Sequence, residues 1–174
     1  MRQNGLNTAK GLSVKLNLGC GSRHFPGFLS VDLACPVGYE GDFQQADLNG
    51  IWPFPTSFCE EVLAYSVLEH LRDKIHTMNE LHRILRPGGI ARIQLPDASE
   101  GDGGHCDPTH KTYWTRSDFE YYHPGIAERD HFRGHGEYAR ITADFKVVSM
   151  SRHMFPRHWG AVVWEIFAVL EAIK

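Results

Sequence analysis

Short apolar runs separated by glycine, proline and polar residues recur along the first hundred positions of the chain. Runs at 14–18, 29–33, 43–48, 61–65 and 90–95 have the length and composition of buried strands. Between the fourth and fifth runs, Ile75–Leu85 carries apolar residues at i, i+3, i+4 spacing, which predicts a helix, and Arg86-Pro87-Gly88-Gly89 is its stop signal. Strands that alternate with crossovers predict an open, mostly parallel α/β sheet.

The last third of the chain predicts a different arrangement. Phe145–Met150 reads as a sixth strand, and Ala161–Leu170 is compatible with a helix or a strand. Its β-branched and aromatic content favours a strand that closes an antiparallel hairpin. Ser117 is the expected N-cap of a short helix. No linker divides residues 1–174, so we predict a single domain with a tail at 1–13 and an acceptor-binding insert at 98–143.

Polar or small residues follow several predicted strands: Gly19, Asp32, Asp47, Ser66 and Asp97. Ligands of open α/β sheets bind outside the carboxyl ends of the strands. The turn Gly19-Cys20-Gly21 lets the backbone approach a ligand closely, because glycine has no Cβ. An acid at the tip of the next strand can accept hydrogen bonds from both ribose hydroxyls. These positions together predict a site for a nucleoside cofactor.

The first crossover is unusually short. Only Ser22–Phe28 separates the glycine turn from the second predicted strand, whereas a parallel crossover normally takes about a dozen residues or more. Asp32 lies 13 positions after Gly19, whereas a dinucleotide fingerprint places its acid about 20 residues after the glycines. This spacing counts against an NAD-binding oxidoreductase and predicts a crossover with little or no helix.

Composition sets outer limits on function. With 174 residues and a net charge of −3, the chain has no global basic field, so we expect no DNA partner. No apolar run approaches the ~20 residues of a membrane span. The four cysteines are scattered without a CxxC pair, which argues against disulfides and a cysteine zinc cluster. The polar N-terminus lacks the apolar core of a secretory signal, so we expect a cytoplasmic protein.

Four blocks carry a resemblance to a known family. They are LNLGCGSRHFPGFLSVDL, QQADLNGIWPFP, VLAYSVLEHL and LHRILRPGGIARIQLPD, in the order found in class I S-adenosylmethionine-dependent methyltransferases. The chain is most similar to the small bacterial methyltransferase type 11-like group, over about residues 14–97. The resemblance implies a Rossmann-like sheet, transferase activity and S-adenosyl-L-methionine as cofactor.

The resemblance also implies roles for individual positions. Those that would bind the cofactor are Leu18, Gly19, Cys20 and Gly21 at its methionine part, Asp32 at the ribose, Leu33 at the adenine, Asp47 and Leu48 at the adenine edge, and Ser66 and Val67 facing the methionine moiety. The Asp/Asn-Pro-Pro-Tyr tetrapeptide of some N-methyltransferases is missing. Ser66-Val67-Leu68-Glu69 stands in its place, which counts against methylation of adenine N6 or glutamine.

The acceptor and its activation are less defined. A hydroxyl acceptor needs a general base, and histidine suits that role, so His110, His70 and His105 are the catalytic candidates. The pair His105 and His110 also suggests a metal, as does His131-x3-His135, but neither spacing on an irregular loop fixes a coordination geometry, and we predict none. We expect a small-molecule or sugar hydroxyl as acceptor, in a monomer or homodimer. A non-catalytic partner subunit that binds the cofactor, and an enzyme acting on protein or RNA, remain alternatives.

Overall fold

The computed structural model describes residues 14–99, 103–126, 135–156 and 162–174. The predicted tail at 1–13, parts of the 98–143 insert, His131 and Ala161 lie outside the described residues.

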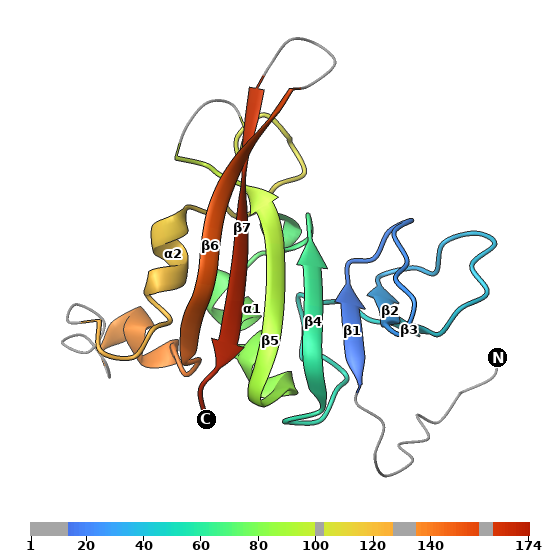
Figure 1. Ribbon diagram of the computed structural model, residues 1–174, viewed down its shortest axis with the longest axis horizontal. Helices are drawn as coiled ribbons and strands as arrows, with labels where there is room; N and C mark the ends of the chain where they lie inside the picture. Colours follow the sequence, from blue (N-terminus) through green and yellow to red (C-terminus); the bar gives the residue numbers. More distant parts are fainter. Residues whose placement is uncertain (1–13, 100–102, 127–134, 157–161) are drawn as a thin grey trace.

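In the described part of the chain, seven strands form one sheet in the order β3-β2-β1-β4-β5-β7-β6 (Figure 1). Pairs among β1 to β5 are parallel, and β7 is antiparallel to both β5 and β6. The bounds are β1 Lys15–Leu18, β2 Leu29–Asp32, β3 Phe43–Gln45, β4 Cys59–Tyr65, β5 Leu85–Pro96, β6 Phe145–Pro156 and β7 Val162–Ala172. The predicted Rossmann-like α/β sheet with an antiparallel C-terminal hairpin is confirmed.

The helix predicted before the fifth strand is α1, Lys74–Ile84. Asp73 caps it, since its Oδ1 accepts the backbone N–H groups of Ile75 at 2.9 Å and His76 at 3.0 Å. Met78, Leu81 and Ile84 are fully buried on its sheet-facing side. The apolar spacing therefore predicted both the helix and its buried face. Figure 1 shows α1 behind the sheet, at the level of β4 and β5.

Shorter helices precede and follow α1. They are the 3-10 helix η1 Leu68–His70, α2 Arg116–Glu120 and the 3-10 helix η2 Gly136–Arg140. The predicted cap of α2 is wrong. Thr115, not Ser117, is the N-cap, because its backbone N–H and its hydroxyl both donate to Asp118 Oδ2, at 2.7 and 2.8 Å. No helix in the described residues is long and apolar enough to cross a membrane.

Several strand ends differ from expectation. β5 begins at Leu85, where it pairs with Cys59 of β4, so the predicted stop Arg86–Gly89 lies inside the strand. β3 stops at Gln45 instead of Leu48, because Asp47 starts a turn in which the Gly50 N–H donates to its carbonyl at 3.2 Å. β6 runs to Pro156, six residues past the predicted end, because β7 pairs with it out to Val162. The second half of β6 is mostly exposed, so its residues do not show the alternation of apolar and polar positions that would predict a strand.

The crossover between β1 and β2 contains no helix, as its length predicted. Residues 19–28 still return in a parallel register, with Leu16 paired to Leu29. The Asn17 side chain donates to the carbonyl of Arg23 at 2.7 Å, which holds the compact loop against the end of β1.

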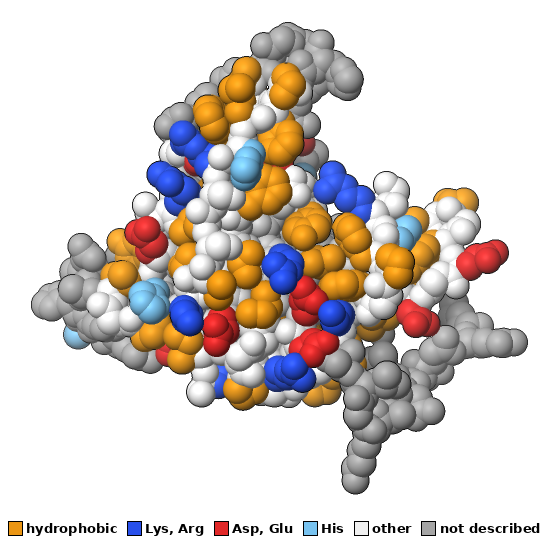
Figure 2. Space-filling model, in the orientation of Figure 1, with side chains coloured by type: hydrophobic (Ala, Val, Ile, Leu, Met, Phe, Trp, Pro, Cys, Tyr) orange, Lys and Arg blue, Asp and Glu red, His pale blue; other side chains and the backbone are white. Residues whose placement is uncertain are grey.

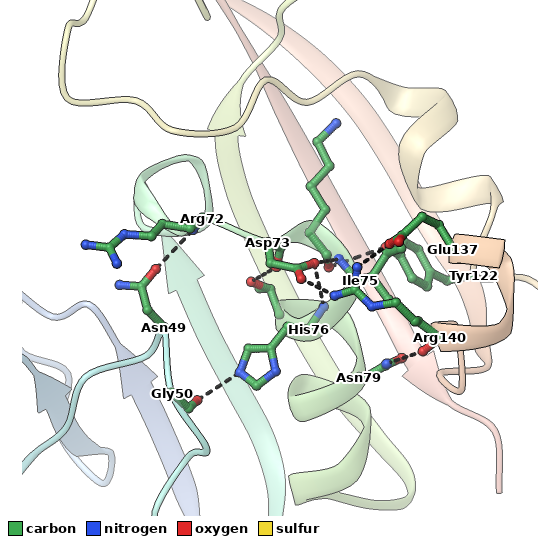
Figure 3. Close-up of polar contacts among 12 residues, drawn as sticks. Asn49, Gly50, Arg72, Asp73, Ile75, His76, Asn79, Tyr122, Glu137 and Arg140 are labelled. Carbon is green, nitrogen blue, oxygen red and sulfur yellow. Dashed lines mark hydrogen bonds and ion pairs between the residues drawn. The ribbon is translucent and has the colours of Figure 1, made fainter.

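The end of the insert is fastened to the outer side of α1 (Figure 3). Arg140 of η2 forms an ion pair with Asp73. Asn79 donates to the Arg140 carbonyl at 2.6 Å and accepts the backbone N–H groups of Thr142 and Ala143, both at 3.0 Å. These bonds place the chain that enters β6.

The opposite face of the sheet is turned toward the viewer in Figures 1 and 2. Figure 2 shows charged side chains of both signs among apolar ones there. Glu61 accepts from Lys15 at 2.9 Å and from Arg92 at 2.8 Å across three adjacent strands. These two ion pairs lie on a partly exposed surface, so they contribute little to the net free energy of folding.

Candidate functional site

The glycine turn after β1 is fixed by its backbone and by its neighbours. Gly19 and Gly21 both have positive φ, +60° and +48°. A Cβ at Gly19 would lie 2.2 Å from Cγ2 of Val67, so a side chain there would collide with the loop after β4. The Gly21 N–H donates to Asp32 Oδ2 at 2.8 Å. The turn thus joins the carboxyl ends of β1, β2 and β4, which the sequence predicted to lie together.

Asp32 stands at the end of β2 with capacity to bind a ligand. Its Oδ1 accepts the Leu33 N–H at 2.7 Å, and its Oδ2 accepts the Gly21 N–H. A carboxylate has about four acceptor positions, so about two remain for hydroxyl groups. The neighbouring Leu33 side chain is 63% exposed. The carboxylate oxygens of Asp32 could accept hydrogen bonds from ribose hydroxyls, and the side chain of Leu33 could pack against the attached base.

Asp47 lies two residues beyond β3 and is held by Asn49. The backbone N–H and the side-chain amide of Asn49 both donate to Asp47 Oδ1, at 2.9 and 3.0 Å, and these bonds lower the pKa of Asp47. Asn49 in turn accepts the Arg72 N–H at 3.0 Å, and His76 contacts the Gly50 carbonyl at 2.8 Å (Figure 3). The loop after β3 is therefore anchored to the start of α1.

Some predicted cofactor residues face the protein core. Leu18, Cys20, Leu48 and Val67 are at most 8% exposed. Any contact of Leu18 or Leu48 with a ligand is consequently left to the backbone.

A cavity of about 590 Å³ opens at the carboxyl ends of β4 and β5. Its walls come from the loop after β4, from η1, from β5 and β7, and from the insert. The lining residues are Ser66, Glu69, His70, Pro96, Gly103, Cys106, Asp107, Pro108, His110 and Glu165. Strand ends of the scaffold and loops of the insert thus meet at one cavity.

Backbone hydrogen bonds bring the insert to this place. The carbonyl of Glu69 accepts the N–H groups of Lys111 at 2.7 Å and Thr112 at 3.0 Å. His110 precedes this contact, and its ring centroid lies 5.0 Å from that of His70. His105 does not line the cavity and instead stacks on Tyr113 at 4.3 Å. Two of the three predicted base candidates are therefore together, and the third is apart.

Both imidazoles in the cavity are oriented through Nδ1. His110 Nδ1 lies 2.8 Å from the Gly104 carbonyl, and His70 Nδ1 lies 3.3 Å from the Thr109 carbonyl. A carbonyl can only accept, so each Nδ1 carries the proton in these contacts. The lone pair of each neutral ring is then on Nε2.

Glu69 lines the cavity but was not among the site residues predicted from the sequence. It is 2% exposed, and its Oε2 accepts no hydrogen bond from any residue in the described ranges. Burial above all, together with the nearby charges of Glu165 and Asp107, raises the pKa of Glu69 to about 7. The adjacent pair Glu69-His70 is visible in the sequence, but the burial of Glu69 follows from tertiary packing.

Asp97 has a structural role. It is fully buried, accepts from the backbone and hydroxyl of Ser99 at 2.9 and 2.6 Å, and lies 3.4 Å from the Arg152 guanidinium. It follows β5 as expected, yet it does not line the cavity.

These residues fit S-adenosylmethionine. Asp32 offers acceptors for ribose hydroxyls, and Leu33 offers an apolar surface for the adenine. Gly21 has open space where a Cβ would stand, so a ligand can approach its backbone. Toward the cavity, the carboxylates of Glu69, Asp107 and Glu165 favour a cationic sulfonium.

Comparisons with known proteins agree with this geometry. A family profile described as "Methyltransferase domain" matches residues 16–93. The fold resembles the YcgJ protein of Bacillus subtilis, with TM-score 0.63, 13% identity and coverage of 93% of this chain and 92% of that one. It also resembles a SAM-dependent methyltransferase of Methanosarcina mazei, with TM-score 0.61, 12% identity and 92% coverage of both chains. No curated protein sequence matches significantly.

A third similar structure has ligands bound. It is 1,6-didemethyltoxoflavin-N1-methyltransferase of Burkholderia thailandensis, with its substrate and S-adenosylhomocysteine, at TM-score 0.58 and 16% identity over 93% of this chain and 72% of that one. Sheet order and strand directions define the class I, Rossmann-like methyltransferase fold. The family match covers residues 16–93, from β1 to most of β5, so this part of the chain is similar to a methyltransferase domain.

Proposed function

We propose that the protein transfers the methyl group of S-adenosylmethionine to a hydroxyl group of a small molecule or sugar. The observation that carries this proposal is the cavity at the ends of β4 and β5, where His70 and His110 stand beside the predicted cofactor residue Ser66. Its volume of about 590 Å³ lies within the ~300–1,000 Å³ typical of small-molecule sites. The Burkholderia neighbour, by its name, also acts on a small molecule.

The bound cofactor would supply a methyl group on a sulfonium. When the acceptor oxygen bonds to the methyl carbon, the electron pair of the S–CH₃ bond would stay on sulfur. The hydroxyl would lose its proton. Nε2 of His70 or His110 is suited to accept that proton, because Nδ1 of each ring already donates to a carbonyl. General-base assistance of this kind contributes about 10²–10⁴-fold. His105, stacked on Tyr113, is the least suited of the three candidates.

The charge of the cavity favours a hydroxyl over an amine. Glu69, Asp107 and Glu165 line it, and among the residues that the structure describes no Lys or Arg does. Nearby carboxylates stabilise an ammonium and raise its pKa. An ammonium nitrogen has no lone pair for attack, so this environment would hold an amine in its unreactive form, whereas a hydroxyl stays neutral.

The insert at 98–143 would serve as the acceptor-binding cap, since Gly103, Cys106, Asp107 and His110 all come from it. The described cysteines are free thiols, which is compatible with the cytoplasmic setting expected from the sequence.

The proposal is tested in two parts. Calorimetry should show S-adenosylhomocysteine binding to wild type and at least about tenfold weaker binding to Asp32→Ala, which loses charge-assisted bonds to ribose worth about 1.5–3 kcal/mol each. A labelled-methyl screen against fractionated small molecules should then yield a product labelled at oxygen. His110→Ala should lose turnover while keeping cofactor affinity. Equal binding by wild type and Asp32→Ala would refute the cofactor site, and label found only in protein or RNA would refute the acceptor class.

A further inference from the structure

Three side chains in the cavity form a set of potential metal ligands. Glu69, His70 and His110 each offer one ligand atom, and these atoms all lie within 4.8 Å of one another. Bonds of about 2.1 Å in a tetrahedral site would place ligand atoms roughly 3.4 Å apart. The side chains thus need to close by little more than about 1 Å around an ion. Two imidazoles and one carboxylate are a common set for catalytic metals.

The burial of Glu69 independently favours a bound cation. Its Oε2 is buried and accepts no hydrogen bond from any group in the described part of the chain. Buried polar atoms are nearly always satisfied, and a buried carboxylate is costly unless it is paired. Asp107 and Glu165 add negative charge to the same walls. A positive ion would supply the partner that this oxygen lacks.

The surroundings of the two imidazoles also suit a metal. Imidazoles that bind metals usually donate their other N–H to a carbonyl or carboxylate, which fixes the ring and directs the free lone pair. Here the Gly104 and Thr109 carbonyls take that role at the two Nδ1 atoms. The bonds from Lys111 and Thr112 to the Glu69 carbonyl then hold the insert against η1. The structure thus contains both the potential ligands and the carbonyl groups that orient the two imidazole rings.

We propose that Glu69, His70 and His110 bind a divalent metal ion of the zinc type, with an open coordination position toward the cavity. Two nitrogen ligands favour such an ion over Mg²⁺ or Ca²⁺, which prefer oxygen. From the sequence, the pair His105 and His110 and the pair His131 and His135 were considered for a metal, and none was predicted. Glu69 and His70, which precede α1, supply the ligands that the insert alone lacks.

The chemical role of the ion rests on the proposed function. An acceptor hydroxyl bound at the open position would have a lower pKa and lose its proton to water or to Asp107, whose Oδ2 lies 3.8 Å from His110 Nε2. The oxygen would keep the electron pair that forms the bond to methyl. His70 and His110 would then act through the ion instead of taking the proton directly.

The test is zinc binding to the full chain after chelator treatment. Calorimetry should give one equivalent of Zn²⁺, Co²⁺ should show visible ligand-field bands, and excess Mg²⁺ should not compete. Glu69→Gln and His110→Ala should weaken zinc binding by more than about 100-fold, beyond the 10–100-fold typical for loss of an outer partner. His105→Ala, the matched control from the same loop whose side chain does not line the cavity, should bind as wild type does.

The outcomes separate this proposal from the previous one. Glu69→Gln keeps the size of the side chain and removes a buried charge, so it should remain folded, with an unfolding temperature that zinc no longer raises. Absence of stoichiometric zinc binding in wild type, or undiminished binding in Glu69→Gln, would overturn the metal site. S-adenosylhomocysteine binding is measured on the same samples. If it persists without zinc binding, methyl transfer with direct proton acceptance stands and only the metal site fails.

Discussion

Glu69→Gln should stabilise the protein in chelator-containing buffer, and the gain should depend on pH. Burial raises the pKa of Glu69 from its usual 4.5 to about 7. Between these values the unfolded chain has an ionised Glu69 and the folded chain a protonated one. The folded state therefore binds more protons, and wild-type stability falls as pH rises through this window. Gln has nothing to ionise, so the variant lacks this loss.

The magnitude follows from the same two values. At about 1.4 kcal/mol for each pH unit between them, the loss reaches about 3 kcal/mol above pH 7 and nearly vanishes below pH 4.5. His70, His110, Asp107 and Glu165 surround the group in both proteins. Their own titration thus largely cancels in the difference.

Urea unfolding at a series of pH values measures this difference directly. We expect Glu69→Gln to exceed wild type by about 3 kcal/mol near pH 8 and by less than about 1 kcal/mol near pH 5. A constant difference across the series, or a variant less stable than wild type at pH 8, would show that Glu69 is not an unpaired buried carboxylate. Replacement of the exposed Glu137 by Gln is the control and should change stability little at any pH.

Two further predictions concern the frame around the site. Burial alone would raise the pKa of Glu80, but bonds from Arg83 at 2.6 and 2.8 Å and from the Trp52 N–H at 2.7 Å together lower it. Glu80→Gln should lower the free energy of unfolding in urea by about 2–4 kcal/mol at neutral pH, and this loss should shrink as the pH falls through the lowered pKa of Glu80. An unchanged free energy of unfolding would argue against a stabilising pair of Glu80 and Arg83. Gly21→Ala, where φ is positive but space is open, should cost about 1 kcal/mol. Gly19→Ala should cost at least about 2 kcal/mol more, because its Cβ would also meet Val67; equal costs would refute that contact.

Much of the scaffold was predictable because it depends on local pattern. The i, i+3, i+4 spacing in α1 gave a helix whose apolar residues are buried. The β-branched content of 162–170 favoured a strand, and β7 is one. The seven residues between Gly21 and Leu29 are too few for a helix and two turns, and none forms. The cap of α2 was missed because Thr115 and Ser117 are both acceptable caps, and the position of Asp118 decides between them.

The candidate site also combines features that the sequence predicts with features that depend on tertiary contacts. The glycine turn and Asp32 were predicted to lie at the same edge of the sheet, and there the Gly21 N–H donates to Asp32 Oδ2 at 2.8 Å. The amino-acid sequence alone thus predicted the class of cofactor and the edge of the sheet where we expect it to bind. Only the tertiary structure decided that His110 joins His70, that His105 does not, and that Glu69 is buried. The physical reason is that these positions depend on hydrogen bonds from Lys111 and Thr112 to the Glu69 carbonyl, more than 40 residues away, and no local periodicity records such a contact.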